Sequence, residues 1–227
     1  MANTIAHLSL AELILSLRPE LVRNRDSFYL GCIAPDAIES KEGAVRDDKK
    51  HVHLRLGITD MEWLEPDKMA IFDERLQRFF EETVLPELDE AQRDFLIGYY
   101  VHLLTDKLHH SMVRLKVLKK MEPLGYVDGT WDFMYIVLDE LAALDHYLLH
   151  SRASTAELFH RLLDGEALHW LPGMIEKEYL EKSLVWWKKN YIPLIAEKEN
   201  KVLAPEDIDI FIENAAEIIV SELERLL

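Results

Sequence analysis

Apolar residues recur at helical spacing along almost the whole of this 227-residue chain, and this periodicity constrains the fold more than any other feature. The first run carries Ile5, Leu8, Leu10 and Leu13, spaced as in a helix. No segment shows the strict alternation typical of a half-buried strand. The counts of Gly 8 and Pro 8 are low for a β-sandwich or a linker-rich protein. We therefore predict an all-α fold of about eight helices in a single domain over residues 1–227.

Capping and turn residues predict where these helices begin and end. Asn3 or Thr4 can cap the first helix, and Pro205 followed by acidic residues suits the first turn of the last one. Pro35 disfavours helix at the residue before it, so Asp36 should lie at a kink or a helix end. The first three expected helices begin at about Thr4, at Asp67 and at Asp89 or Glu90, and the third runs to about Lys119. A fourth helix ends near His150, and three more are expected at Ser154–Leu163, Gly173–Glu199 and Pro205–Leu227. Residues 39–53 are predicted to be a polar loop.

The chain is acidic, with 26 Lys and Arg against 42 Asp and Glu and a net charge of −16. Such a surface repels the nucleic acid backbone, so we expect no nucleic-acid binding. The single cysteine, Cys32, excludes an intramolecular disulfide framework and fits a reducing compartment. No apolar stretch is long enough to span a bilayer and no secretory leader is recognisable. These features together favour a cytoplasmic location.

One histidine and one aspartate stand four residues apart in an otherwise apolar segment, at His102 and Asp106. Residues four apart in a helix differ by only about 40° around its axis, so the two side chains share one face. A buried carboxylate needs a compensating partner, because an isolated charge in a low-dielectric interior is very costly. A divalent cation with the imidazole as second ligand is one such partner. A direct hydrogen bond between the two side chains is the alternative.

Three further metal-capable residues, His7, Asp36 and His53, lie in or beside apolar segments. A histidine such as His7 on an apolar helix is often a core residue with satisfied hydrogen bonds, and Asp36 could equally cap a helix. His51 and His53 alternate, so in an extended segment they would point to opposite sides, and one could bind a metal while the other faces solvent. The alternative is a pair of surface histidines. The accumulation of five such residues favours a metal site.

The ordered set of these residues resembles the zinc-dependent phospholipase C family, to which fungal single-strand nucleases are related. The family pattern is an early histidine, a Gly-x-x-x-Pro-Asp turn, a lysine-rich stretch ending in His-Phe and a Gly-Tyr-x-x-His-x-x-x-Asp helix. Over about its first half this chain has, in the same order, His7, Gly31-Cys32-Ile33-Ala34-Pro35-Asp36, Lys49-Lys50-His51-Val52-His53-Leu54 and Gly98-Tyr99-Tyr100-Val101-His102-Leu103-Leu104-Thr105-Asp106. Leu54 replaces the aromatic residue usual at that position.

The resemblance implies an all-helical, phospholipase C/nuclease-like fold with one or two zinc ions, although other divalent metals also bind such ligands. Asp36, His53, His102 and Asp106 would hold one ion, an N₂O₂ set that suits zinc. His7 would join Asp106, acting as a bridging carboxylate, at a second ion. Asp36 is alternatively a general base. The implied activity is hydrolysis of a phosphate ester by a metal-activated water.

Family members use additional ligands after the helical motif. The family spacing selects His110, whereas helix geometry slightly favours His109. The next helix should supply another ligand, for which we prefer Glu140. The side chains available there are Asp139, Glu140, Asp145 and His146. Some members also use the amino group of a processed N-terminus, which this chain, having no recognisable leader, is not expected to provide.

The predicted function is therefore a zinc-dependent phosphodiesterase acting on a phospholipid or on a small water-soluble phosphoester. Lys49, Lys50 and Arg55 could steer the phosphate, unless they belong to a solvated loop. Net charge −16 argues against binding to anionic membranes. The alternative is a non-enzymatic helical interaction protein that keeps the family scaffold. In that case Trp186 and Trp187 could form a homodimer face, although paired aromatics in such helices are more often core residues.

Overall fold

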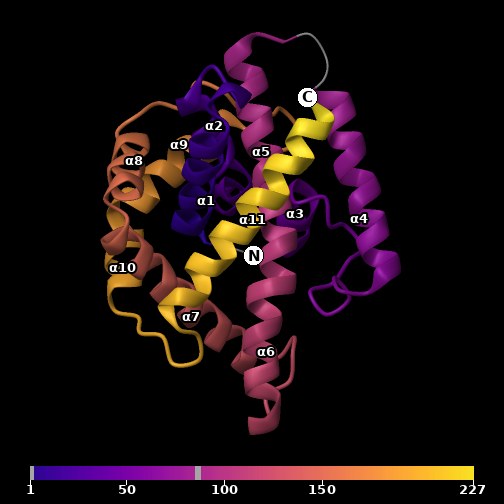
Figure 1. Ribbon diagram of the computed structural model, residues 1–227, viewed down its shortest axis with the longest axis vertical. Helices are drawn as coiled ribbons and strands as arrows, with labels where there is room; N and C mark the ends of the chain where they lie inside the picture. The colour runs from indigo at the N-terminus through magenta and orange to yellow at the C-terminus, as the bar shows by residue number, and fades with distance from the viewer. Residues whose placement is uncertain (1–2, 85–87) are drawn as a thin grey trace. The chain divides into compact units, whose positions relative to one another are not determined.

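The computed structural model describes residues 3–84 and 88–227. Within these residues the chain is helical, and its one extended pairing is an isolated bridge between Leu171 and Ile175, so the all-α prediction is confirmed. The α-helices (Figure 1) are α1 (Thr4–Leu17), α2 (Arg25–Gly31), α3 (Arg46–Val52), α4 (Pro66–Phe79), α5 (Glu90–His109), α6 (Leu115–Met121), α7 (Trp131–Ser151), α8 (Ala153–Leu163), α9 (Lys177–Trp186), α10 (Ile192–Ala196) and α11 (Pro205–Leu226). The 3₁₀ segments are η1 (Pro19–Leu21), η2 (Ala34–Ser40) and η5 (Glu122–Leu124), and the π-helical segments are η3 (Phe80–Val84), η4 (His110–Arg114) and η6 (Trp187–Tyr191).

Most predicted helix ends agree with the structure to within a few residues, but the α-helices are more numerous than the eight or so expected. Two of the long predicted helices are each interrupted by a π-helical turn. The helix expected from residue 90 to 119 consists of α5, η4 and α6, and the one expected over 173–199 contains α9, η6 and α10. A π-turn shifts the hydrogen bonds from i−4 to i−5 over a single turn, which displaces the apolar pattern by only one residue. Sequence periodicity therefore does not reveal it.

The predicted loop at residues 39–53 is wrong in its second half, where the chain forms α3. The helix is short and polar, so its apolar periodicity is weak. Charge placement stabilises it instead, with Asp47 and Asp48 in the first turn and basic residues in the last turn, as the helix dipole favours. The Asp48 carboxylate also accepts a 2.9 Å hydrogen bond from the Val45 N–H. This helix carries Lys49 and Lys50, and the predicted ligand His53 follows it directly.

The described chain divides into two compact units that are both discontinuous in sequence. Unit 1 comprises Met1–Pro19, Leu104–His160 and Lys189–Leu227, and unit 2 comprises Glu20–Leu103 and Arg161–Lys188. Helix α5 therefore contributes its first part to unit 2 and its last part to unit 1. The assignment of residues 1–227 to a single domain stays a prediction.

Helix α1 is the central element of unit 1 and packs on α11 and α7 (Figure 1). Its first half is buried on every side, as expected for a helix that is apolar around its whole circumference. Its N-terminus has no side-chain cap of its own. Asp145 of α7 replaces that cap, accepting hydrogen bonds of 2.8 Å and 3.1 Å from the N–H groups of Ile5 and Ala6. This long-range cap joins α1 to α7.

In unit 2 the 3₁₀ segment η2 packs on α9 and α3. The hydroxyls of Ser40 and Ser183 lie 2.7 Å apart and join η2 to α9. The two adjacent tryptophans at the end of α9 differ in their surroundings: Trp187 is buried, whereas Trp186 is 45% exposed. The pair is therefore divided between core and surface, and a homodimer through this face stays a prediction.

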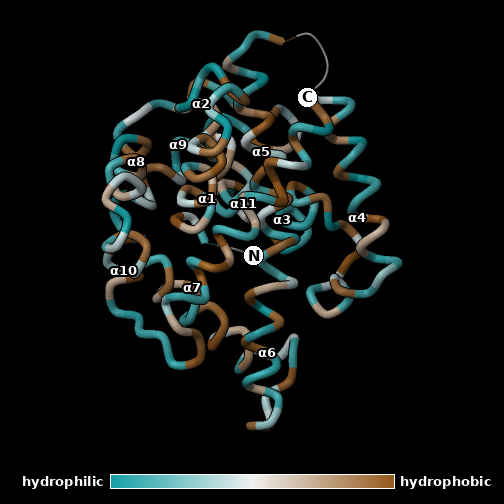
Figure 2. The backbone as a smooth tube through the Cα atoms, viewed as in Figure 1, coloured by the Kyte–Doolittle hydropathy of each residue, from teal (hydrophilic) through white to brown (hydrophobic). Residues whose placement is uncertain are grey.

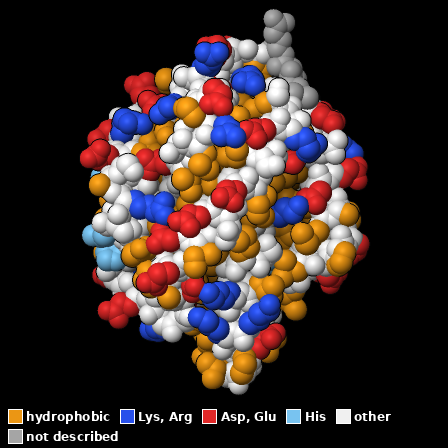
Figure 3. All heavy atoms as spheres, viewed as in Figure 1, with side chains coloured by type: hydrophobic (Ala, Val, Ile, Leu, Met, Phe, Trp, Pro, Cys, Tyr) orange, Lys and Arg blue, Asp and Glu red, His pale blue; other side chains and the backbone are white. Residues whose placement is uncertain are grey.

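Within the described residues, no helix is both long enough and apolar enough to cross a lipid bilayer. On the face seen in Figure 3, acidic and basic side chains are interspersed. Many of them form ion pairs between exposed groups, such as Arg161 with Asp26 and Lys182 with Glu178. Exposed pairs of this kind contribute little to stability.

Candidate metal centre

Two glycines bring the backbones of α2 and α5 into direct contact in unit 2. A Cβ atom on Gly31 would lie 2.0 Å from the carbonyl oxygen of Phe95, and one on Gly98 would lie 2.1 Å from that of Phe28. Both distances are far below van der Waals contact, so only glycine permits this approach. The close crossing brings the end of α2 within hydrogen-bonding reach of the next turn of α5. The two glycines of the sequence motif thus have a structural explanation.

His102 of α5 is oriented by this crossing. Its Nδ1 lies 2.8 Å from the carbonyl oxygen of Cys32, and the ring is fully buried. A carbonyl oxygen can only accept, so Nδ1 must carry the hydrogen and donate it. In the neutral imidazole this leaves Nε2 as the atom with the lone pair. Metal-binding histidines are commonly oriented in the same way, through a bond from the other ring nitrogen to a backbone carbonyl.

His53 has the same arrangement at the end of α3. Its Nδ1 lies 2.8 Å from the carbonyl oxygen of Lys49, which again places the hydrogen on Nδ1. His53 is 1% exposed, although the neighbouring α3 is largely polar. Both imidazoles are therefore held by backbone carbonyls. For His53 the carbonyl lies one helical turn earlier in the chain, and for His102 it lies across the contact between α2 and α5. Each presents Nε2 toward the interior.

A Schellman motif fixes the position of His53. The N–H of Leu54 donates to the carbonyl of His51 at 3.0 Å, and that of Arg55 donates to the carbonyl of Lys50 at 2.7 Å. Leu54 has φ 57, in the left-handed region that non-glycine residues seldom adopt. The helix consequently ends at His53. The expected alternation along an extended segment is wrong, because His51 belongs to the last turn of α3 and is exposed.

The Nε2 atoms of His53 and His102 face each other at 3.2 Å. If both rings are neutral, each Nε2 is an acceptor, and two lone pairs at this distance repel. The Oδ1 atom of Asp36 lies 3.5 Å from the same Nε2 of His53. The ligand atoms of these three residues all lie within 4.8 Å of one another. A cation, either a metal ion or a shared proton, resolves the repulsion between them.

Asp36 supplies the negative charge of this group from η2, where Pro35 occupies the first turn. Burial alone would raise the pKa of Asp36, but the ammonium of Lys49, 3.1 Å from Oδ1, and the ring of His53 hold it well below its usual range. Burial would likewise lower the pKa of Lys49, but Asp36 and Glu39 raise it above its usual value. At neutral pH the carboxylate is therefore ionised and the lysine is charged.

The structure also brings together His7 and Asp106 within unit 1. The Nε2 atom of His7, on α1, lies 3.5 Å from Oδ1 of Asp106, on α5, and both side chains are 1% exposed. Asp106 follows His102 by one turn of the same helix. His7 and Asp106, which the sequence analysis assigned to a second ion, therefore lie close together in the protein interior. The bridging role of Asp106 stays a prediction.

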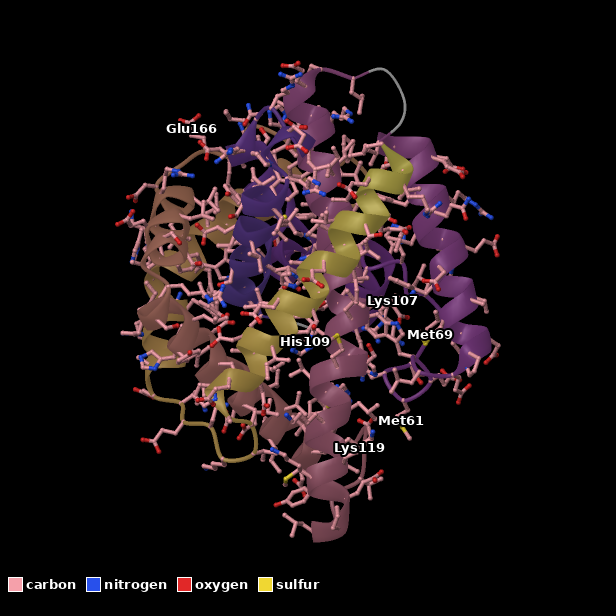
Figure 4. The ribbon with its side chains drawn as sticks, in the orientation of Figure 1. Met61, Met69, Lys107, His109, Lys119 and Glu166 are labelled. Atoms are coloured by element: carbon pink, nitrogen blue, oxygen red, sulfur yellow. The ribbon has the colours of Figure 1, made fainter. Side chains whose placement is uncertain are left out.

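His109 is the last residue of α5, and His110 is the first residue of the π-helical segment η4. Angles calculated for a regular α-helix do not carry across such a turn. His109 (labelled in Figure 4) is fully buried, and its ring meets Phe211 of α11 edge-on at a centroid distance of 5.3 Å. Neither ring nitrogen of His109 has a hydrogen-bond partner among the described residues, and burial holds its pKa well below the usual value. His110 is 3% exposed, and its assignment as a ligand stays a prediction.

Glu140 has a structural task in unit 1. Its carboxylate accepts hydrogen bonds of 2.7 to 3.0 Å from the N–H groups of Lys201, Val202 and Leu203 and from the side chain of Asn200. These donors belong to the hydrophilic loop before α11, seen in Figure 2. Such saturation by donors leaves little lone-pair capacity for a metal. The role of Glu140 as a ligand therefore stays a prediction, with a strong structural alternative.

The other acidic and imidazole side chains of α7 that the sequence offered also have partners. Asp139 pairs with Lys198, Asp145 caps α1, and the ring of His146 packs on His150 at 4.2 Å. The amino terminus, which some relatives of the resembled family use as a ligand, lies outside the described residues.

Of the three basic residues expected near a phosphate, Lys49 alone contacts the metal group. Arg55 is 4% exposed, binds Asp60, and lies 3.6 Å above the ring of Trp63, so it is part of the core of unit 2. Lys50 lies 3.8 Å from Asp47, three residues earlier in α3. Lys49 contacts Asp36 through its side chain and His53 through its carbonyl.

No protein-family model, no curated protein and no solved structure matches this chain. The resemblance to the zinc-dependent phospholipase C family accordingly rests on the ordered motifs alone. The geometry of Asp36, His53 and His102 is independent of that resemblance.

Proposed function

We propose that this protein is a metal-dependent phosphoester hydrolase whose metal ion is held by Asp36, His53 and His102. The observation that carries the proposal is the opposition of two Nε2 atoms at 3.2 Å, each belonging to an imidazole whose Nδ1 hydrogen is committed to a backbone carbonyl. A divalent cation converts this repulsion into two coordinate bonds. The ionised carboxylate of Asp36 completes a group of three ligands.

The donor set suits zinc. Two imidazole nitrogens and one carboxylate oxygen are borderline ligands that Zn²⁺ accepts readily, although Mn²⁺ and Fe²⁺ share such sites. Three protein ligands leave a coordination position for water or substrate, which is typical of catalytic rather than structural zinc sites. The sequence-based assignments of Asp106 as a fourth ligand of this ion and of His7 to a second ion stay predictions beside this three-ligand proposal.

A bound zinc ion would lower the pKa of a coordinated water toward about 7 and neutralise charge on a phosphoryl oxygen. The protein side chains have distinct tasks around it. The backbone carbonyls of Cys32 and Lys49 fix the tautomers of the two histidines. Asp36 is kept strongly ionised, so it is a weak proton acceptor, which favours its role as a ligand over that of a general base. The ammonium of Lys49 lies beside it and would attract an anionic ester.

The choice of a phosphate ester as substrate is supported by the motif resemblance and by Lys49. Hydrolases of carboxylic esters or amides can use similar metal ligands, so the ligand set does not choose between substrates. A partly exposed ammonium next to the ligands favours an anionic substrate. The non-enzymatic scaffold remains the alternative, and metal content together with hydrolysis distinguishes it.

Metal analysis of the purified protein and of matched histidine variants tests the proposal. We expect wild type to retain about one zinc ion or more per chain and to hydrolyse bis(p-nitrophenyl) phosphate. Chelation should abolish hydrolysis, and added zinc should restore it. His53→Ala and His102→Ala should lose both metal and activity, because two ligands hold the ion poorly.

His51→Ala is the matched control, since His51 lies in the last turn of α3, two residues before the C-cap residue His53, but is exposed. It should keep the metal and the activity of wild type. Normal metal content in both His53→Ala and His102→Ala would refute the site. Metal binding without hydrolysis of any phosphate ester would support the metal site but refute the proposed activity.

A further inference from the structure

A solvent-open cavity of about 300 Å³ lies in unit 2, and most of its lining residues are exposed. Through Lys49 it adjoins the group of Asp36, His53 and His102, which we call the metal-ligand group. The cavity is formed within the segment 38–49, which comprises the end of η2, the following turn and the first part of α3. We call it the 38–49 cavity. Its lining residues are Ile38, Glu39, Ala44, Val45, Arg46 and Lys49.

Lys49 connects this cavity to the metal-ligand group. Its side chain lines the cavity, and its Nζ lies 3.1 Å from Oδ1 of Asp36. Its carbonyl accepts the hydrogen bond that orients His53. A molecule in the 38–49 cavity therefore lies next to the ligands, with the ammonium of Lys49 between them.

The lining combines an apolar part with a charged part. Ile38, Ala44 and Val45 supply the apolar surface. The charged part consists of Arg46, Lys49 and Glu39, and Lys49 forms an ion pair with Glu39. The carboxylates that pair with the two cations from outside the lining are Asp36 and Asp60. Ligand pockets typically combine apolar walls with a few charged groups that fix orientation.

We propose that the 38–49 cavity holds the apolar alcohol portion of a phosphate ester whose phosphate is bound at the metal-ligand group. This inference rests on the proposed hydrolase function and specifies its substrate class. On hydrolysis, water adds to phosphorus, the P–O bond to the alcohol breaks, and the alkoxide takes up a proton to leave as the free alcohol. The positive charge of Lys49, which lies between the two sites, stabilises the negative charge that develops on the leaving oxygen.

The volume of the cavity limits the size of that alcohol. About 300 Å³ is at the lower end of the range for small-molecule pockets. It suits a compact group such as a single aromatic ring or a short alkyl chain. The substrate class is therefore a small phosphoester with a compact apolar leaving group, rather than a lipid with two long acyl chains.

Binding of two phosphodiesters that react slowly or not at all tests the inference without relying on activity. Diphenyl phosphate and dimethyl phosphate carry the same charge and differ in their apolar groups. By isothermal titration of the zinc-loaded protein, we expect diphenyl phosphate to bind roughly tenfold tighter or more, since apolar groups in a pocket give selectivity of this order. Val45→Trp should fill the cavity and abolish that preference while the affinity for dimethyl phosphate stays the same.

Val127→Trp is the matched control, because Val127 is as exposed as Val45, 59% against 61%, but does not line the cavity. It should keep the preference of wild type. Ala44→Phe at a second lining position should repeat the effect of Val45→Trp, and melting curves of all variants verify their folding.

Equal affinities of wild type for the two esters, or a preference that survives both cavity variants, would overturn the inference while leaving the proposed hydrolase intact. A protein that neither retains zinc nor hydrolyses phosphate esters would refute the proposed function. In that case an aryl preference that Val45→Trp removes would show a binding pocket, and the leaving-group assignment would be withdrawn.

Discussion

Individual side chains in this protein show how a polar group in an apolar setting obtains a partner. His53 and His102 use backbone carbonyls for one ring nitrogen and present the other to a shared site. Asp145 and Glu140 are equally buried, but their oxygens accept backbone N–H groups. Burial of a polar side chain therefore does not identify it as a candidate ligand, because Asp145 and Glu140 are buried as deeply as the two histidines. The number of N–H donors around the oxygens separates structural carboxylates from ligands.

Glu140→Ala tests this distinction. The substitution leaves several buried N–H groups of the 200–203 loop without an acceptor, so we expect the free energy of unfolding to fall by about 3 kcal/mol or more. Metal content should not change. Denaturant unfolding and metal analysis measure the two effects, with Asp139→Ala, an exposed neighbour, as control. Loss of metal at unchanged stability would instead support the sequence-based assignment of Glu140 as a ligand.

Asp145 predicts a pH dependence of stability. Burial raises its pKa to about 6 from a usual value of 3.8, despite hydrogen bonds from Tyr191, Ile5 and Ala6 that favour the ionised form. The folded state thus binds a proton more tightly than the unfolded chain. The resulting stabilisation is fully present below about pH 3.8 and is lost as the pH rises through about 6.

The asparagine variant isolates this contribution from other titrating groups. Asp145→Asn keeps a carbonyl oxygen for the N–H groups of α1 but does not titrate. We expect the stability of wild type relative to this variant to decline between pH 4 and pH 6.5 in urea unfolding experiments. Parallel stability curves over that range would show that Asp145 titrates at an ordinary pKa when folded.

At the level of helices, the contact between α2 and α5 is the feature on which the site most depends. The two glycines at the crossing allow backbone atoms to touch, and the bond from His102 to Cys32 follows from that approach. A glycine in a helix interior costs stability relative to alanine in the absence of such a contact. The positions of Gly31 and Gly98 within helical segments could therefore have predicted a close crossing.

Gly98→Ala should separate the two helices. A Cβ atom 2.1 Å from the Phe28 carbonyl oxygen cannot be accommodated, so we expect a loss of about 3 kcal/mol or more in unfolding free energy. Metal retention should fall with it, because the carbonyl of Cys32 moves away from His102. Gly165→Ala, whose nearest contact would be 3.3 Å, is the control and should have a small effect. Unchanged stability and metal content in Gly98→Ala would mean that the backbones of α2 and α5 lie farther apart than the structure shows.

Helix α3 shows what local sequence rules miss. Its polar composition led to the prediction of a loop, and no glycine or asparagine marks its end. The chain nevertheless ends the helix with Leu54 in the left-handed region. Backbone strain of this kind is tolerated where surrounding contacts over-determine the conformation, and it is frequent at functional sites. The burial of Val52 and His53 supplies such contacts.

For the molecule as a whole, the distribution of charge matters more than the net value of −16. The cations near the candidate site are paired, Lys49 with Asp36 and Glu39 and Arg46 with Asp60. Bound zinc would add positive charge at the same place, so an anionic small molecule is attracted locally despite the acidic surface. Repulsion of an extended polyanion such as nucleic acid by the average field of the acidic chain stays a prediction.

The helical class could be predicted from the sequence because helix periodicity depends on neighbours three and four residues apart. The pairing of His102 with Asp106 on one helical face could be anticipated for the same reason. The convergence of Asp36, His53 and His102 was expected only through the resemblance of the ordered motifs, and the commitment of both Nδ1 hydrogens and the role of Glu140 were not expected at all. They depend on contacts between residues up to 70 positions apart, such as that of His102 with Cys32. Long-range packing sets these distances, and helix periodicity alone does not encode them.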